Sequence, residues 1–140
     1  MSAPRDPAAV VAALHAAFNA RDIEALVALF AEDYDSVQPA HPDRAFAGAA
    51  QVRKNWSTVF DGVPDLRGEL VDSAVDGDTA WSEWRWRGTH TDGSAMDMVG
   101  VIVLGVRDGR IATGRLFMEP VEQHGPGIDA QARRMAGRDA

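Results

Sequence analysis

The chain of 140 residues contains no cysteine. This absence excludes disulfide bonds, thiolate catalysis and the cysteine-ligated zinc and iron–sulfur sites, and it is typical of proteins in a reducing compartment. Residues 1–20 also lack a long apolar run between a basic start and a cleavage site, so we expect neither a signal peptide nor a membrane span. The sequence therefore favours a cytoplasmic protein without membrane association.

Basic residues are scarce as well, with Lys+Arg 14 against Asp+Glu 21 and a formal net charge of −7. This balance repels phosphate backbones, and the basic residues do not gather into a stripe, so nucleic acid is not an expected partner. No two histidines have the i, i+4 spacing of a helical metal site, and no glycine-rich phosphate loop follows a strand. We therefore expect no metal, no nucleotide and no other cofactor.

The first part of the chain carries three helical patterns. Asp6 and Pro7 supply an N-cap and a first-turn proline for one helix, and Asp22 caps a second that extends to Phe30. Only the residues "NARD" separate the two apolar stripes, which predicts a helical hairpin, and a third helix follows a proline-rich break. The apolar positions are Val10, Leu14 and Phe18, then Ile23, Leu26, Val27 and Phe30, then Val52, Trp56, Val59 and Phe60.

The pattern changes after Pro64 to strands separated by turns that place Gly after Asp. We predict antiparallel strands at about 66–75, 78–90, 95–107 and 110–122. Helices followed by a strand meander indicate an α+β domain in which a curved sheet covers the helices. The predicted domain spans residues 1–122, and residues 123–140 form a polar tail with room for one short helix.

Several short motifs occur in a specific order: "FNARD" at the helix junction, "LFAED" closing the second helix, "WRGTH" at a strand end and "DGRI" before the last strand. In this order they resemble the nuclear transport factor 2-like superfamily, in its SnoaL-like and ketosteroid-isomerase-like branch, over about residues 8–122. The resemblance implies a cone-shaped antiparallel sheet wrapped around the helical hairpin and the third helix. It also implies a pocket between helices and sheet, often in a dimer.

The same resemblance shows which acids are missing. The first-helix tyrosine of the steroid isomerases corresponds to Leu14, and their general-base aspartate corresponds to Gln38. Cyclases and epoxide hydrolases of this superfamily place an aspartate on the last strand, where this chain has Leu116. An amide has no useful basicity near neutral pH, so the steroid isomerase mechanism is not expected.

The segment "SEWRWRGTH" places Trp84 and Trp86 on one face of a strand, because side chains alternate with a period of two. The resemblance to the family implies that this strand face points into the pocket. Any one of these aromatics is most simply a core residue, but their number suits a planar or polycyclic ligand. The predicted ligand-binding residues are Leu14, Phe18, Phe30, Tyr34, Gln38, Trp56, Phe60, Ser82, Trp84, Trp86, Leu116 and Met118.

The opposite face carries Trp81 beside the valines of the next strand, Val99, Val101 and Val103. An apolar strip bordered by charges predicts a homodimer interface. Arg115 and Glu119 should lie on this outer face as surface or interface ion-pair residues, with Glu83 and Arg85 as neighbours across the strands. A register shift of one residue would bring them inside.

Two functions remain open. The first is a binding protein for an apolar small molecule, which the loss of the family acids favours. The second is a cofactor-independent enzyme that isomerises, cyclises or dehydrates a small cyclic or polyketide-like substrate. In that enzyme Gln38 polarises a carbonyl, and His41 or Tyr34 moves the proton. A solvent-exposed loop position is the simpler interpretation of His41, and proximity to Gln38 is the basis for its catalytic role.

Overall fold

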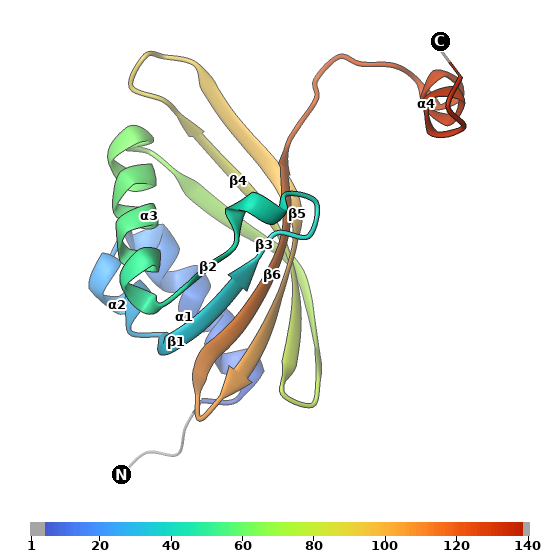
Figure 1. The fold of residues 1–140 in the computed structure, drawn as a ribbon. Coiled ribbons are helices and arrows are strands. Elements are labelled where there is room, and N and C mark those ends of the chain that lie inside the picture. The colour runs from blue at the N-terminus through green and yellow to red at the C-terminus, as the bar shows by residue number, and fades with distance from the viewer. Residues whose placement is uncertain (1–4, 139–140) are drawn as a thin grey trace.

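The computed structural model describes residues 5–138, so residues 1–4 of the predicted domain and residues 139–140 of the predicted tail lie outside the described part. It confirms the α+β class and the curved sheet around the helices (Figure 1). In chain order the elements are α1 Pro7–Ala20, α2 Ile23–Val27, β1 Phe30–Val37, a 3-10 turn Pro42–Arg44, β2 Phe46–Ala47, α3 Ala49–Gly62, β3 Arg67–Asp76, β4 Thr79–Thr89, β5 Ala95–Arg107, β6 Arg110–Pro120 and α4 Ile128–Met135.

The sheet has the strand order β2-β1-β6-β5-β4-β3. All neighbouring strands pair antiparallel except β1 and β6, which are parallel. The long strands β3 to β6 match the predicted ones closely, because turn glycines and alternating side chains define them. Figure 1 shows α1 and α3 on the concave side of the sheet, so the space between helices and sheet is where a site can form.

The junction "FNARD" attaches α1 to the rest of the domain. The amide of Asn19 makes two hydrogen bonds with the backbone of Gly68 in β3, donating to its oxygen at 2.9 Å and accepting from its nitrogen at 2.7 Å. Arg21 ends α1 in the left-handed region (φ 56°) and donates to the carbonyl of Phe60 near the end of α3. Asp22 then caps α2. The motif thus has a structural role: it connects the end of α1 to β3 and α3, and it starts α2.

The second helix is shorter than predicted. It ends at Val27, and Phe30 starts β1 instead of ending the helix, so "LFAED" leads into a strand. The backbone N–H of Ile111 donates to the carbonyl of Leu29 at 2.7 Å, and Phe30 is aligned with Ile111 in the parallel pair. Pairing with β6 overrides the helical apolar spacing at this point.

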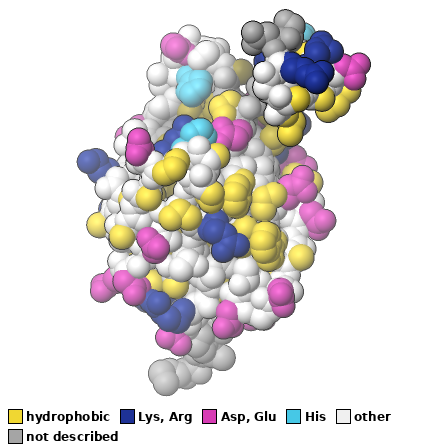
Figure 2. Space-filling view, turned by 45° about the vertical axis from the view of Figure 1, so that its right-hand side comes forward, with side chains coloured by type: hydrophobic (Ala, Val, Ile, Leu, Met, Phe, Trp, Pro, Cys, Tyr) yellow, Lys and Arg dark blue, Asp and Glu magenta, His cyan; other side chains and the backbone are white. Residues whose placement is uncertain are grey.

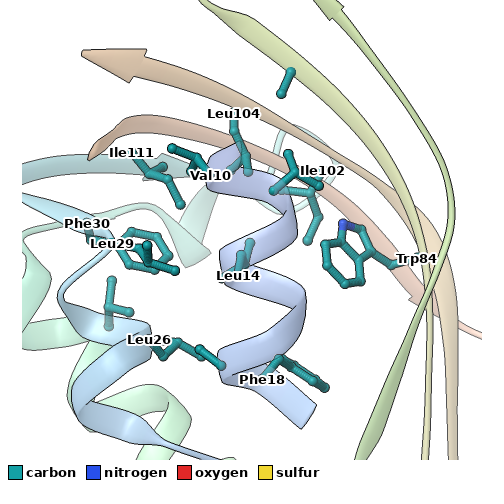
Figure 3. Close-up of a cluster of buried hydrophobic side chains, with 14 of the residues drawn as sticks. Val10, Leu14, Phe18, Leu26, Leu29, Phe30, Trp84, Ile102, Leu104 and Ile111 are labelled. Atoms are coloured by element: carbon teal, nitrogen blue, oxygen red, sulfur yellow. The ribbon is translucent and has the colours of Figure 1, made fainter. Parts of the chain in front are cut away.

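The core lies between α1 and the concave face of the sheet (Figure 3). The Trp84 indole points from β4 toward α1 and is 2% exposed. Its Nε1 donates to Ser82 Oγ at 2.8 Å, and Ser82 Oγ donates to the Ile102 carbonyl at 2.8 Å. The indole nitrogen of Trp84 and the hydroxyl of Ser82 are therefore both paired, which holds this indole in one orientation.

The convex face of the sheet is partly apolar and solvent-exposed. Figure 2 shows hydrophobic side chains gathered around a basic one on the side of the molecule where the sheet lies. Trp81 is 46% exposed, Phe117 42% and Val99 39%. Val103 differs from the predicted strip, because it is 3% exposed. Its cross-strand neighbours are Trp81 and Arg115, and the Arg115 guanidinium lies 5.7 Å from the Trp81 ring centroid, so these two side chains cover it.

The predicted outward direction of Arg115 and Glu119 agrees with the structure, but their predicted strand partners do not. Arg115 contacts the Trp81 ring, and Glu119 binds His41. Arg85 instead forms a two-point contact with Asp97 of β5, at 3.0 and 2.8 Å. The strand face of these residues could thus be predicted from sequence spacing, but their contact partners could not.

Helix α4 lies in the predicted tail and stands away from the sheet (Figure 1). Its two large apolar residues, Ile128 and Met135, are each 81% exposed. Over residues 5–138, none of the helices has the length and apolar character needed to cross a membrane.

Candidate functional site

A cavity of about 270 Å³ lies between the concave face of the sheet and the helices. Its walls come from α1, α2 and α3, from strands β1, β2, β4, β5 and β6, and from the loop with the 3-10 turn after β1. The lining residues are Leu14, Phe18, Leu26, Phe30, Tyr34, Ser36, Gln38, Arg44, Phe46, Val52, Asn55, Trp56, Val59, Trp84, Trp86, Met96, Met98, Ile102, Leu104, Leu116 and Met118.

One end of the cavity has aromatic walls. Phe18 of α1 stacks on Trp86 of β4, with ring centroids 5.6 Å apart and an interplanar angle of 23°. Trp56 of α3 meets the same indole edge-on, at 5.2 Å and 87°. The Nε1 of Trp86 is buried and has no hydrogen-bond partner among the described residues. This end presents flat apolar surface in two directions, which suits a flat ligand.

Gly100 allows β5 and β6 to approach each other closely. It lies opposite Trp84 on one side and Met118 on the other, in the row of residues that crosses the inner face. A Cβ at this position would lie 2.0 Å from the carbonyl oxygen of Phe117, so only glycine fits the close approach of β5 and β6. The row consequently has no side chain between the indole and the thioether.

Three polar residues of the cavity follow one strand and its continuation. Tyr34 and Ser36 are alternate residues of β1, and Gln38 continues their spacing directly after the strand ends, so all three face the cavity. Ser36 is 2% exposed. Gly114 of β6 makes room for the phenol, because a Cβ there would lie 2.2 Å from the Tyr34 hydroxyl. The cavity thus has a polar edge along β1, and the remaining walls are apolar apart from Asn55 of α3 and the Arg44 side chain at the edge.

Tyr34 supplies an uncharged, weakly acidic phenol to this polar edge. Burial raises the pKa of its phenol above the ordinary value, and the negative charge of Asp35 adds to this, while a hydrogen bond with Ser36 lowers it. The hydroxyl therefore stays protonated at neutral pH and is available as a hydrogen-bond donor.

Arg44 stands where the polar edge reaches solvent. It is exposed, and its Nη1 donates to Gln38 Oε1 at 3.0 Å. Among the described lining residues it is the one that carries a full charge at neutral pH. His41 belongs to the same loop but does not line the cavity, and its Nε2 lies 2.6 Å from Glu119 Oε1 on β6.

The structure brings together all but two of the predicted ligand-binding residues. Phe60 is instead buried behind the wall, with its ring centroid 5.8 Å from that of Phe18. Ser82 lies behind Trp84, which it holds in place through the hydrogen bond to Nε1. His41, the predicted catalytic residue, lies outside the lining on the loop.

Sequence reasoning missed several lining residues. Met96 and Met98 share the inward period of β5 with Ile102, so the strand pattern could have identified them. Arg44 and Asn55 carried no such signal, because one lies on an irregular loop and the other at the polar border of α3.

The chemistry available in the cavity is limited to hydrogen bonding and one positive charge. None of the lining residues carries a carboxylate or an imidazole. Within residues 5–138, no three histidine, aspartate or glutamate side chains gather in a way that could hold a metal ion. The phenol of Tyr34 is the weakly acidic group among the lining residues.

Several solved structures share this fold. IdmH of Streptomyces antibioticus, a proposed polyketide cyclase, is 24% identical, with 82% of this chain and 93% of that chain covered and a TM-score of 0.72. A SnoaL-like protein of Jannaschia sp. CCS1, also a proposed polyketide cyclase, is 20% identical over 84% and 92%, with a TM-score of 0.70. A Catenulispora acidiphila protein with a ketosteroid isomerase-like fold is 21% identical over 79% and 85%, with a TM-score of 0.65.

These identities establish a shared fold and not a shared activity. No curated protein sequence matches the chain significantly. The family model for the SnoaL-like domain matches residues 11–114, which run from within α1 to the first half of β6. By this match the chain belongs to the SnoaL-like family.

Proposed function

We propose that this protein binds a flat, mainly apolar small molecule in the cavity beneath the sheet. The observation that carries the proposal is the cavity's lining, in which aromatic and aliphatic walls meet a single polar edge and no carboxylate. Small-molecule sites typically combine such apolar walls with a few polar groups that orient the ligand. The volume of about 270 Å³ favours a compact ligand of a few fused rings.

Tryptophan fluorescence tests this proposal. A polycyclic aromatic ketone should quench the wild-type emission saturably, and Trp84→Ala should weaken that binding, because Trp84 lines the cavity. Trp81→Ala is the matched control, since Trp81 lies three residues away on the outer face of the same strand. Saturable quenching that survives in Trp84→Ala but disappears in Trp81→Ala would place the ligand on the wrong face and contradict the proposal.

A second candidate is a cofactor-independent enzyme for isomerisation, ring closure or dehydration of a small cyclic or polyketide-like substrate. The protonated phenol of Tyr34 supports it, because this group and Gln38 face the cavity from one strand edge and could polarise a carbonyl. His41 would act as proton carrier in this scheme only after its contact with Glu119 opens. The proposed activities of the fold's relatives point in the same direction.

Substitution at position 38 separates the two candidates. Wild-type protein should show no steroid double-bond isomerisation, because it has Gln38 and Leu14 where the steroid isomerases have their base and their phenol. Gln38→Asp should yield a trace at most, since Arg44 would pair with the new carboxylate and weaken it as a base. Formation of the conjugated enone is followed by ultraviolet absorbance, and robust turnover by the wild type would favour the enzyme.

The proposal includes a homodimer that forms through the convex face of the sheet. Trp81, Val99, Val101 and Phe117 form the apolar strip there, and the charged residues around it supply a polar rim. We propose a cytoplasmic location for this dimer, which the absence of cysteine supports.

A further inference from the structure

We infer that Arg44 and Gln38 select a ligand with an anionic oxygen, such as a carboxylate, phenolate or enolate, and hold it at the mouth of the cavity. This inference rests on the proposed binding function and names the chemical class of the ligand. It concerns two residues that lie side by side in the structure, although only Gln38 was predicted to belong to the site.

The direction of the Arg44–Gln38 hydrogen bond identifies which groups of the two side chains can still bind a ligand. A guanidinium group only donates, so the atom of Gln38 that faces Arg44 must be its carbonyl oxygen. The amide nitrogen of Gln38 is then left to donate elsewhere. Since both side chains line the cavity, two sets of N–H donors are available beside one another at its mouth. Converging donors of this kind match an oxygen that carries negative charge.

The charge of Arg44 is not already neutralised by a nearby acid. No carboxylate among the described residues lies within ion-pair distance of Arg44, and its printed side-chain partner is the neutral amide of Gln38. Because Arg44 is exposed, its attraction for a ligand charge is that of a surface group and is screened by salt.

The loop that presents Arg44 is itself held in place. The backbone N–H of His41 donates to the Gln38 carbonyl at 2.7 Å, and the backbone N–H of Arg44 donates to the His41 carbonyl at 3.0 Å. The His41 side chain fastens this turn to Glu119 on β6. The backbone that carries Arg44 is therefore fixed before a ligand arrives, and the hydrogen bond to Gln38 orients the guanidinium, which reduces the entropy lost on binding.

A matched pair of fluorescent probes tests the inference. Anilinonaphthalene sulfonate is anionic, and phenylnaphthylamine has the same ring skeleton without the sulfonate. The wild type should bind the anionic probe roughly five- to tenfold more tightly than the neutral one. Arg44→Met should abolish this preference and leave the affinity for the neutral probe within about twofold, whereas Arg44→Lys should retain part of the preference.

Arg110→Met is the matched control, because it removes the same charge from an exposed position at the start of β6 that does not line the cavity. It should keep the wild-type preference. Rising salt should reduce the preference for the anionic probe without changing the affinity of the neutral one. Phe117→Ser should also keep it, since this variant reduces the apolar strip on the outer face where a probe could otherwise bind.

The outcomes separate the inference from the function on which it rests. Equal binding of both probes by the wild type would overturn the role of Arg44 and leave the apolar binding site intact. Loss of the preference in Arg110→Met or Phe117→Ser would also overturn it, because the charge effect would then be general or external. Failure of both probes to bind the wild type would contradict the proposed binding function itself.

Discussion

The two faces of β4, β5 and β6 differ in how their side chains are used. On the concave face, Trp84 and Met118 are buried in apolar surroundings, and the polar atoms behind them are paired. On the convex face, Trp81 is nearly half exposed, and Arg85 and Asp97 bind each other. Since both sets alternate along the same strands, the backbone alone does not distinguish the two surfaces.

Two rows of paired residues across β4, β5 and β6 illustrate this difference. The inner row through Trp84 has Gly100 at its centre and therefore lacks a side chain there. The outer row through Trp81 has Val103 at its centre, and the residues on either side cover it. The inner row thus has no central side chain, whereas the outer row three residues away along β4 is covered over its central residue.

The largest expected effect compares two tryptophans of β4. Trp84→Ala should lower the free energy of unfolding by about 3–5 kcal/mol, because it deletes a buried indole, whereas Trp81→Ala should cost under about 1 kcal/mol. Urea denaturation monitored by circular dichroism measures both. Similar losses in the two variants would mean that the outer face is as tightly packed as the core, and the contrast between the faces would fail.

Disruption of the proposed dimer should have the next largest effect. Val101→Lys places a charge in the apolar strip beside Phe117, at a cost of about 2 kcal/mol in each protomer. Because a two-fold interface contains the substitution twice, the dimer should weaken about a thousandfold. Light scattering should show a dimer for the wild type and a soluble monomer for the variant. A wild type that remains monomeric at high concentration would refute the interface.

Tyr34 offers a direct measurement inside the cavity, because it is the single tyrosine of the chain. Its raised pKa predicts that tyrosinate absorbance in the folded protein develops at a higher pH than in the urea-unfolded chain. The unfolded state then loses its proton first, so the free energy of unfolding should fall as the pH rises above about 10.

Tyr34→Phe removes this titration and should abolish that part of the alkaline loss of stability. The same pH series on His41→Gln serves as the comparison, because that variant leaves the phenol in place. A tyrosine that titrates at its ordinary pKa in the folded protein would show that the phenol is in contact with solvent, and that the polar edge of the cavity is wet.

The smallest effect is expected for His41→Gln. The side chain lies outside the cavity lining and contacts the exposed Glu119, so the free energy of unfolding should change by no more than about 0.5 kcal/mol. Affinity for the neutral probe should stay the same within error. A strong loss of turnover on any substrate that is later found would restore His41 as the proton carrier of the enzymatic alternative.

Much of the cavity could be predicted because it is built on periodic elements. Trp84, Trp86 and Met118 follow from strand alternation, and Leu14 and Phe18 from helical spacing. Phe30 was assigned to a helix because its spacing from Leu26 fits one, and only the pairing with β6, distant in the sequence, places it in a strand. Arg44 depends on a turn that no periodicity describes, and its pairing with Gln38 depends on that turn.

The cavity beneath the sheet would link the folding equilibrium to the supply of the proposed ligand. A ligand that occupies the cavity binds only the folded chain, so it stabilises that chain by mass action, by about 2.7 kcal/mol when its free concentration is a hundred times its dissociation constant. The melting temperature of the protein would then rise with the concentration of that ligand. Within a cell, the abundance of the protein would rise and fall with the availability of its ligand, because unfolded chains are the ones that proteases remove.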